Sequence, residues 1–185
     1  MDLVILKPGA SDIFNAETTA SLVDGDILDS GEDISGGIEL VSCNWGMHQQ
    51  MTTDVSNTAR TSGRPNLNDI TIVKYLDRIS PVLYRYCLSA TPIDDGEEPT
   101  QIFLCRNANQ NGDENVIGSI MTISLYNCMI SSVQAQSHPN DMATEQLTLN
   151  FTDIAWSATH QLSDASVAGS VAYQWSVTRN RQTVS

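Results

Sequence analysis

Apolar and polar residues alternate along most of the chain, which predicts a protein built mainly of β-strands. A period of two residues is typical of a half-buried strand, because successive side chains point to opposite faces of a sheet. The segment Asn68–Asp77 is also rich in β-branched and aromatic residues, which favour extended chain. The pattern predicts strands at Leu3–Leu6, Ile38–Trp45, Asn68–Asp77, Gln101–Asn107, 117–136, 147–156 and Val171–Thr178.

Two of these strands change their apolar face partway along. In 117–136 the apolar positions move from odd to even numbers near Tyr126-Asn127, and in 147–156 they do so after Thr152-Asp153. Each switch predicts a bulge or a bend, and two of them on adjacent strands predict a sheet that folds over. We therefore expect a mainly β fold, either a small closed β-barrel or a two-sheet, barrel-like sandwich. The Asn-Gly-Asp turn after Asn107 predicts a hairpin between its flanking strands.

One segment follows a helical period instead. From Pro81 to Ala90, apolar side chains recur at a spacing of three to four residues and form one stripe. Ser80 is placed to cap the free amide protons of the first turn, and proline is tolerated there. Pro92 prevents the helix from continuing. The sequence thus predicts one short flanking helix at about residues 80–90.

Length and charge restrict the class of protein. A chain of 185 residues suits a single domain with a substantial buried core. Its 22 acidic and 9 basic side chains give a formal charge of -13, so Coulomb repulsion disfavours nucleic acid as a partner. Many of the acids crowd the first forty residues, where Ala10–Gly37 is expected to be a long and mostly irregular segment.

The sequence also bears on location. No apolar run approaches the ~18 residues of a membrane-spanning helix. The N-terminal segment lacks the basic start and the longer apolar stretch of a signal peptide. We therefore expect no membrane insertion and a cytoplasmic origin.

Candidate metal ligands and thiols are widely separated. His48, His138 and His160 have no second ligand at helical or hairpin spacing, so we expect no metal site and no cofactor. The cysteines at positions 43, 87, 105 and 128 form no Cys-x-x-Cys pair and have apolar or strand-like neighbours. Buried free thiols are favoured over disulfides or zinc.

The sequence also lacks the motifs of nucleophilic catalysis. It contains no Gly-x-Ser-x-Gly elbow, no Ser-x-x-Lys and no glycine-rich turn that leads into a helix. The acidic run Asp94–Glu98 imitates a calcium loop, but it lacks the alternating ligand spacing and is expected to be a solvated turn. We therefore expect that the protein is not an enzyme.

The order of these elements, together with five motifs, resembles the haemolysin-coregulated protein (Hcp) family. Five motifs in the same order are far more specific than any one of them. The resemblance covers roughly residues 38–157 and the first strand. The motifs are Cys43-Asn44-Trp45-Gly46-Met47, Ile70-Thr71-Ile72-Val73-Lys74-Tyr75-Leu76-Asp77, Ser80-Pro81-Val82-Leu83, Met129-Ile130-Ser131-Ser132-Val133 and Glu145-Gln146-Leu147-Thr148-Leu149-Asn150-Phe151.

The resemblance implies a single Hcp-like β-barrel domain over 1–185 whose hexameric rings stack into the inner tube of a type VI, contractile secretion system. It implies as partners further copies of the chain, a VgrG-like spike protein, the sheath, and effector proteins held in the lumen. It also implies assembly in the bacterial cytoplasm and then secretion without a signal peptide. The chain departs from the family by an acidic insertion at about 10–37 and a C-terminal extension at about 158–185.

Two groups of residues are candidates for assembly contacts. The polar loop, Met47–Arg64, is expected to connect stacked rings, because its side chains can hydrogen-bond to a facing ring without forming a large apolar patch. A second group is expected to pack in the core or in an interface. The stacking residues are His48, Gln50, Thr52, Asp54, Asn57, Arg60 and Arg64, and the packing residues are Trp45, Trp156, Leu83 and Phe151.

Other hypotheses remain open. A phage-like tail-tube subunit shares the same physics and differs mainly in its neighbouring genes. A monomeric β-barrel that binds a small ligand in its interior belongs to a different class, and would have one deep apolar cavity. An enzyme with an unrecognised site would show a cluster of perturbed titratable groups in a pocket.

Overall fold

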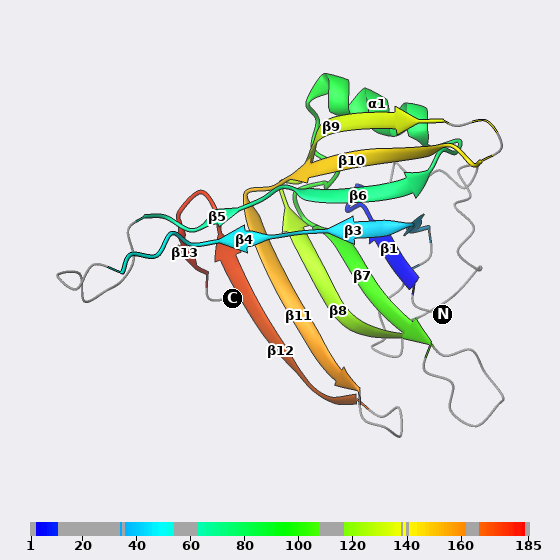
Figure 1. Cartoon of the computed structure of the whole chain (residues 1–185). Coiled ribbons are helices and arrows are strands. Elements are labelled where there is room, and N and C mark those ends of the chain that lie inside the picture. The colour runs from blue at the N-terminus through cyan, green and yellow to red at the C-terminus, as the bar shows by residue number, and fades with distance from the viewer. Residues whose placement is uncertain are drawn as a thin grey trace.

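A computed structural model describes the chain at residues 3–10, 34, 36–53, 63–107, 117–137, 139, 141–161 and 167–183. Strands dominate this part of the chain, and α1 (Ser80–Ser89) matches the predicted helix (Figure 1). The strands are β1 (Leu3–Lys7), β2 (Ile38–Leu40), β3 (Ser42–Asn44), β4 (Met47–His48), β5 (Asn66–Leu67), β6 (Ile70–Tyr75), β7 (Thr100–Asn107), β8 (Ile117–Tyr126), β9 (Met129–Gln136), β10 (Thr144–Asn150), β11 (Asp153–Gln161), β12 (Val167–Ser176) and β13 (Arg181–Gln182).

The described strands form three antiparallel sheets. A seven-stranded sheet has the order β13-β12-β11-β8-β7-β1-β2, a four-stranded sheet has the order β3-β6-β10-β9, and β4 pairs with β5. The predicted hairpin is confirmed, because β7 pairs with β8. Figure 1 shows the four-stranded sheet across one end of the longer sheet, with α1 beside β9. The mainly β fold is confirmed in its two-sheet form, since the described strands do not close into a barrel.

Both predicted changes of face are points where the chain passes from one sheet to the other. Between β8 and β9, Asn127 adopts a left-handed backbone with φ 50°, and the N–H of Cys128 donates to Asp94 Oδ2 at 2.7 Å. Between β10 and β11, the N–H of Thr152 donates to the carbonyl oxygen of Tyr126 at 3.1 Å. This bond joins the two corners, so both strands turn at the same place.

The main core lies between the sheets. Its fully buried members come from both layers, including Ile70 and Ile72 on β6 and Ile123 and Leu125 on β8. Isoleucine and leucine fill alternate positions of these strands, because only one face of each strand meets the other sheet. The helix adds Leu83, which is buried against the same cluster.

A smaller cluster covers the opposite face of the seven-stranded sheet. Ile5, Phe103 and Cys105 point to this face, and Ile34 packs on them with none of its surface exposed. Ile34 belongs to the segment 10–37 that we expected to be irregular, and residues 11–33 of that segment lie outside the described part of the chain. The described end of this acidic segment is therefore anchored to the sheet by an apolar side chain.

The start of α1 differs from the prediction. Ser80 does not cap the helix; it is the first helical residue. Among the described residues no side chain caps the first helical turn; instead Asp77 Oδ1 accepts the N–H of Ile79, the residue before the helix, at 3.0 Å, while Ser80 Oγ accepts the N–H of Asp77 at 3.1 Å. This reciprocal pair resembles a capping box. The helix ends at Ala90, where φ is 50°. The part of the chain that the structure describes contains no helix long and apolar enough to cross a membrane.

Candidate functional site

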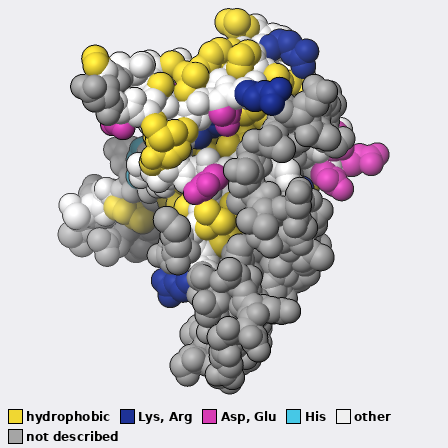
Figure 2. Space-filling view, turned by 90° about the vertical axis from the view of Figure 1, so that its right-hand side faces the viewer, with side chains coloured by type: hydrophobic (Ala, Val, Ile, Leu, Met, Phe, Trp, Pro, Cys, Tyr) yellow, Lys and Arg dark blue, Asp and Glu magenta, His cyan; other side chains and the backbone are white. Residues whose placement is uncertain are grey.

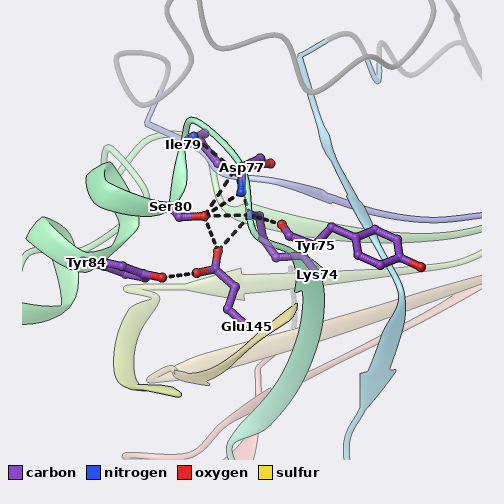
Figure 3. Close-up of polar contacts among 7 residues, drawn as sticks. All are labelled: Lys74, Tyr75, Asp77, Ile79, Ser80, Tyr84 and Glu145. Carbon is purple, nitrogen blue, oxygen red and sulfur yellow. Dashed lines mark hydrogen bonds and ion pairs between the residues drawn. The ribbon is translucent and has the colours of Figure 1, made fainter. Parts of the chain in front are cut away.

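A buried ion pair joins β6 to β10 directly beneath the start of α1. Lys74 and Glu145 are cross-strand neighbours, and their side chains are 1% and 0% exposed. Lys74 Nζ lies 2.8 Å from Glu145 Oε1 and 2.8 Å from Asp77 Oδ1 (Figure 3). The ammonium also donates to the carbonyl oxygen of Tyr75 at 2.7 Å. A buried charge is tolerated only when it is paired and hydrogen-bonded, and both conditions hold here.

Two hydroxyl groups from α1 complete this cluster, which we call the Lys74 cluster. Ser80 Oγ donates to Glu145 Oε1 at 2.7 Å, and Tyr84 OH donates to Glu145 Oε2 at 2.5 Å. Burial, followed by the hydrogen bond to Glu145 and the charge of Glu145, raises the pKa of Tyr84 to about 12. Both carboxylate oxygens of Glu145 therefore have donors, and they tie the helix to the sheet. The arrangement fixes structure and offers no free group to a substrate.

The sequence analysis did not find this cluster. Leu76 shares the even-numbered phase of Ile70 and Ile72, but it is 47% exposed because β6 ends at Tyr75. Lys74 continues the buried phase of Ile70 and Ile72, and Glu145 has the phase of the buried leucines of β10. The sequence does contain one signal for this cluster: Lys74 and Glu145, which are oppositely charged, both occupy positions that the alternation assigns to the buried face of a strand.

The ends of the polar loop form an arm. β4 pairs with β5, so the chain leaves the sheets at Met47 and returns at Leu67 (Figure 1). His48 is exposed, with Nε2 3.5 Å from Asn66 Nδ2. The side chain of Gln49 donates to the carbonyl oxygen of Gly63 at 2.8 Å.

The expected stacking residues are only partly described. Gln50 and Arg64 are exposed and Thr52 is half-buried. The described part of the loop also exposes two apolar side chains, Met47 and Met51. Asp54, Asn57 and Arg60 lie outside the described residues.

The four expected packing residues fall in different environments. Leu83 and Phe151 are buried. Trp156 is half-buried and packs against the core from β11, and its ring stacks on Tyr173 of β12 with centroids 6.4 Å apart. Trp45 is 37% exposed and lies between β3 and β4. A single chain thus leaves part of the Trp45 surface available for a contact.

A groove opens where the arm meets the seven-stranded sheet. We call it the aromatic groove; its volume is about 580 Å³, and most of its lining is apolar. The indole N–H groups of Trp156 and Trp175 are buried and have no acceptor among the described residues. The lining residues are Met47, His48, Gln49, Pro65, Leu67, Trp156, Tyr173 and Trp175.

A second exposed apolar surface lies at the C-terminal end of β6. Its members, here called the end patch, are Val41, Tyr75, Leu76 and Met142, which are 50%, 47%, 47% and 65% exposed. They are neighbours because the N–H of Val41 donates to the carbonyl oxygen of Val73 and that of Leu76 to the carbonyl oxygen of Ala143. Figure 2, which faces this side, shows apolar side chains gathered next to acidic ones.

The titratable groups do not form a reactive centre within the described residues. All four cysteines are free; Cys105 and Cys128 are buried, while Cys43 and Cys87 are half-buried. Burial raises the pKa of the Cys43 thiol to about 11 and raises that of Cys128 as well, so neither is a ready nucleophile.

The acidic run is solvated at residues 95–98, as expected, but Asp94 is half-buried and accepts the N–H of Cys128. The backbone N–H groups of Glu98 and Glu97 hold the pKa of the exposed Asp95 below its usual value. No group of three His, Cys, Asp or Glu side chains suited to a metal ion occurs in the described ranges.

These features define a β-protein of two packed sheets with an exposed arm and exposed apolar surfaces. The family model described as "Type VI secretion system effector, Hcp" matches residues 15–157, and the chain belongs to this family. The resemblance seen in the sequence is therefore confirmed. Hcp proteins are secreted structural components of the type VI secretion tube and are not an enzyme family, and membership supports a tube-protein role.

Individual relatives agree with this assignment. Protein hcp1 of Pseudomonas aeruginosa is 31% identical over 119 residues, which cover 63% of this chain and 68% of that protein. The structure also matches a solved type six secretion system protein with TM-score 0.75 and 15% identity, covering 99% of this chain and 100% of that one. Hcp1 from Salmonella typhimurium matches with TM-score 0.66 and 15% identity, covering 98% and 99%. The two structural matches establish the shared fold.

Proposed function

We propose that this chain forms hexameric rings, and that the rings stack into the inner tube of a type VI secretion system. The observation that carries the proposal is membership of the Hcp family, supported by the unpaired sheet edges of the described chain. In this proposal the protein catalyses no reaction, and its function is to form the wall of the tube.

Ring closure uses the sheet edges. β9 pairs with β10 on one side only, and β12 is covered on its outer side by β13 only at Trp175 and Ser176. Val171 on β12 is 77% exposed. Such edges favour pairing with another chain, and a protein that polymerises can use them for that purpose. Six copies that join edge to edge make a cyclic, heterologous contact.

Stacking of rings uses the polar loop. The exposed arm of β4 and β5 reaches away from both sheets, as a contact with a facing ring requires (Figure 1). Removal of residues 51–62 should preserve rings and abolish tubes, because β4 and β5 remain while the loop between them is shortened. Electron microscopy measures both, and tubes of unchanged length after the deletion would refute the assignment.

The remaining parts of the proposal follow from the family. The chain acts as one domain, with an acidic insertion at about 10–37 and an extension at about 158–185 that contributes β12 and β13. It assembles in the bacterial cytoplasm and is then exported with a VgrG-like spike by the contracting sheath, without a signal peptide. Its lumen holds effector proteins. Nucleic acid is not a partner, because the charge of -13 repels phosphate, and no membrane insertion takes part.

One observation favours a second candidate. The aromatic groove has the volume of a small-molecule site, since such sites measure about 300–1,000 Å³. A monomeric ligand-binding protein would keep a mass of 20.2 kDa at every concentration, whereas a ring subunit would not. Native mass spectrometry over a concentration series separates the two. A phage-like tail tube would assemble in the same way and is distinguished by its neighbouring genes.

A further inference from the structure

We infer that the aromatic groove of one copy receives the end patch of a second copy, so that copies join head to tail. The inference rests on the proposed self-assembly and names the surfaces that meet. Large exposed apolar surfaces on a single chain mark sites of interaction. The aromatic groove and the end patch are two such surfaces among the described residues; a third is the hollow between α1 and β9 that Leu88 lines.

The two surfaces lie at opposite ends of the molecule. The chain runs from Val41 at the end patch through β3 to His48 at the groove, and Figure 1 shows this path as a nearly straight line. Seven residues of extended chain span about 23 Å. The end patch therefore cannot fill the groove of its own copy, and the geometry favours a contact between copies.

The apolar parts of the two surfaces are complementary. The groove is concave and presents Met47, Tyr173 and other apolar side chains, with Met47 58% and Tyr173 44% exposed. The end patch presents Tyr75 and Leu76 at the tip of a strand, each 47% exposed. The aromatic groove can bury Tyr75 and Leu76 of a second copy. Aromatic side chains that fill pockets often supply most of the affinity of an interface.

The charged side chains around the surfaces also differ in sign. Arg64 and Arg181 are both exposed: Arg64 precedes Pro65 of the groove lining, and Arg181 on β13 pairs with the residue after Trp175. His48 lines the groove. Asp141 beside Met142 is exposed at the end patch. These charges orient approaching copies even though the whole chain carries -13.

The end patch is not uniformly acidic. Arg78 is exposed near it, and Asp77 is already paired with Lys74. The charges therefore assist orientation, while the apolar contact provides most of the attraction.

This contact joins two different surfaces of identical chains. If each added copy continues in the same direction, the assembly does not close into a ring, and it grows into a filament whose two ends differ. The groove lies at the base of the arm, so this contact belongs between stacked rings rather than within a ring. The polar loop then surrounds an apolar centre, as a polar rim surrounds the core of an ordinary interface.

The test uses one substitution on each surface. Met47→Glu places a carboxylate in the groove, and Leu76→Glu places one in the end patch; both positions are exposed, so the fold tolerates the change. Leu88→Glu is the matched control, because Leu88 is 87% exposed on α1 and lines the separate hollow beside β9, away from both surfaces. Circular dichroism should show the same thermal midpoint for all three variants.

Electron microscopy of each variant, alone and in a 1:1 mixture, decides the inference. Alone, M47E and L76E should form rings that do not stack, while L88E should form tubes like the parent chain. Mixed, they should give pairs of rings and no longer tubes, because the intact patch of M47E meets the intact groove of L76E at one junction.

Three outcomes would overturn the inference: tubes from either variant alone, loss of rings in either variant, or a mixture without pairs. A parent chain that never forms rings would instead overturn the proposed function, and the inference with it.

Discussion

The Lys74 cluster provides the most direct test of how the fold is held. Lys74→Met removes the ammonium and leaves the carboxylate of Glu145, which is 0% exposed, without its counter-charge. Breaking a buried pair in this way costs about 3–5 kcal/mol, because an uncompensated charge stays in a low-dielectric interior. A domain has a total stability of about 5–15 kcal/mol, so the variant should lose a large fraction of it.

Urea unfolding followed by circular dichroism measures this loss at one fixed protein concentration, since assembly shifts apparent stability. With a slope of about 2 kcal/mol per molar urea, the midpoint should fall by about 2 M. Arg78→Met is the control: it removes an exposed cation beside the cluster and should change stability by about 0.5 kcal/mol or less.

Removal of both charges tests the mechanism behind the loss. Lys74→Met combined with Glu145→Gln leaves no buried charge in the pair. The amide oxygen can accept from one of the two hydroxyl groups of Ser80 and Tyr84, and the amide NH2 can donate to the other. The double variant should therefore be more stable than Lys74→Met alone. The reasoning fails if Lys74→Met costs no more than Arg78→Met, or if the double variant is the less stable one.

Three further predictions address other parts of the molecule. Tyr84 has a pKa raised from 10.0 to about 12, so its contribution to stability is complete below pH 10 and is lost as the pH rises toward 12; Tyr84→Phe should flatten this alkaline decline in a urea series. Cys43 has a pKa raised from 9.0 to about 11, so at pH 7.5 its thiolate fraction should be about 100-fold below that of a free thiol, and labelling with a thiol reagent should be correspondingly slow. Labelling at the free-thiol rate in the folded protein would contradict this burial. Gly9→Ala should cost at least about 2 kcal/mol, because the added Cβ would collide with the backbone carbonyl of Glu98, whereas Gly63→Ala meets only ordinary contacts and should be close to neutral in the same urea assay.

The alternation of side chains was sufficient to predict most strands and both corners. The apolar positions change from odd to even numbers near Tyr126-Asn127 and after Thr152-Asp153. Each change involves neighbouring residues only, so it can be detected without knowing which strand is the partner. A third corner was missed: Ile38–Trp45 was predicted as one strand, but the chain changes sheet at Val41. The apolar positions do move there from even numbers, Ile38 and Leu40, to odd numbers that begin at Val41. The same phase signal that predicted the other two corners was therefore present, but the segment was interpreted as one strand.

The Lys74 cluster shows the limit of local patterns. Lys74 and Glu145 are 71 positions apart in the chain, and only the register of β6 with β10 places them opposite each other. Without the register, a lysine in a strand is interpreted as a solvent-facing side chain. The same applies to the aromatic groove, whose walls come from the arm, β11 and β12 and become neighbours only in the folded chain.

The central claim is that identical copies of this chain seal one another's open sheet edges into a ring. Native mass spectrometry of the purified protein, at several protein and salt concentrations, measures this directly. We predict a dominant species of six times 20.2 kDa, about 121 kDa. A single species of 20.2 kDa under all conditions would contradict the claim.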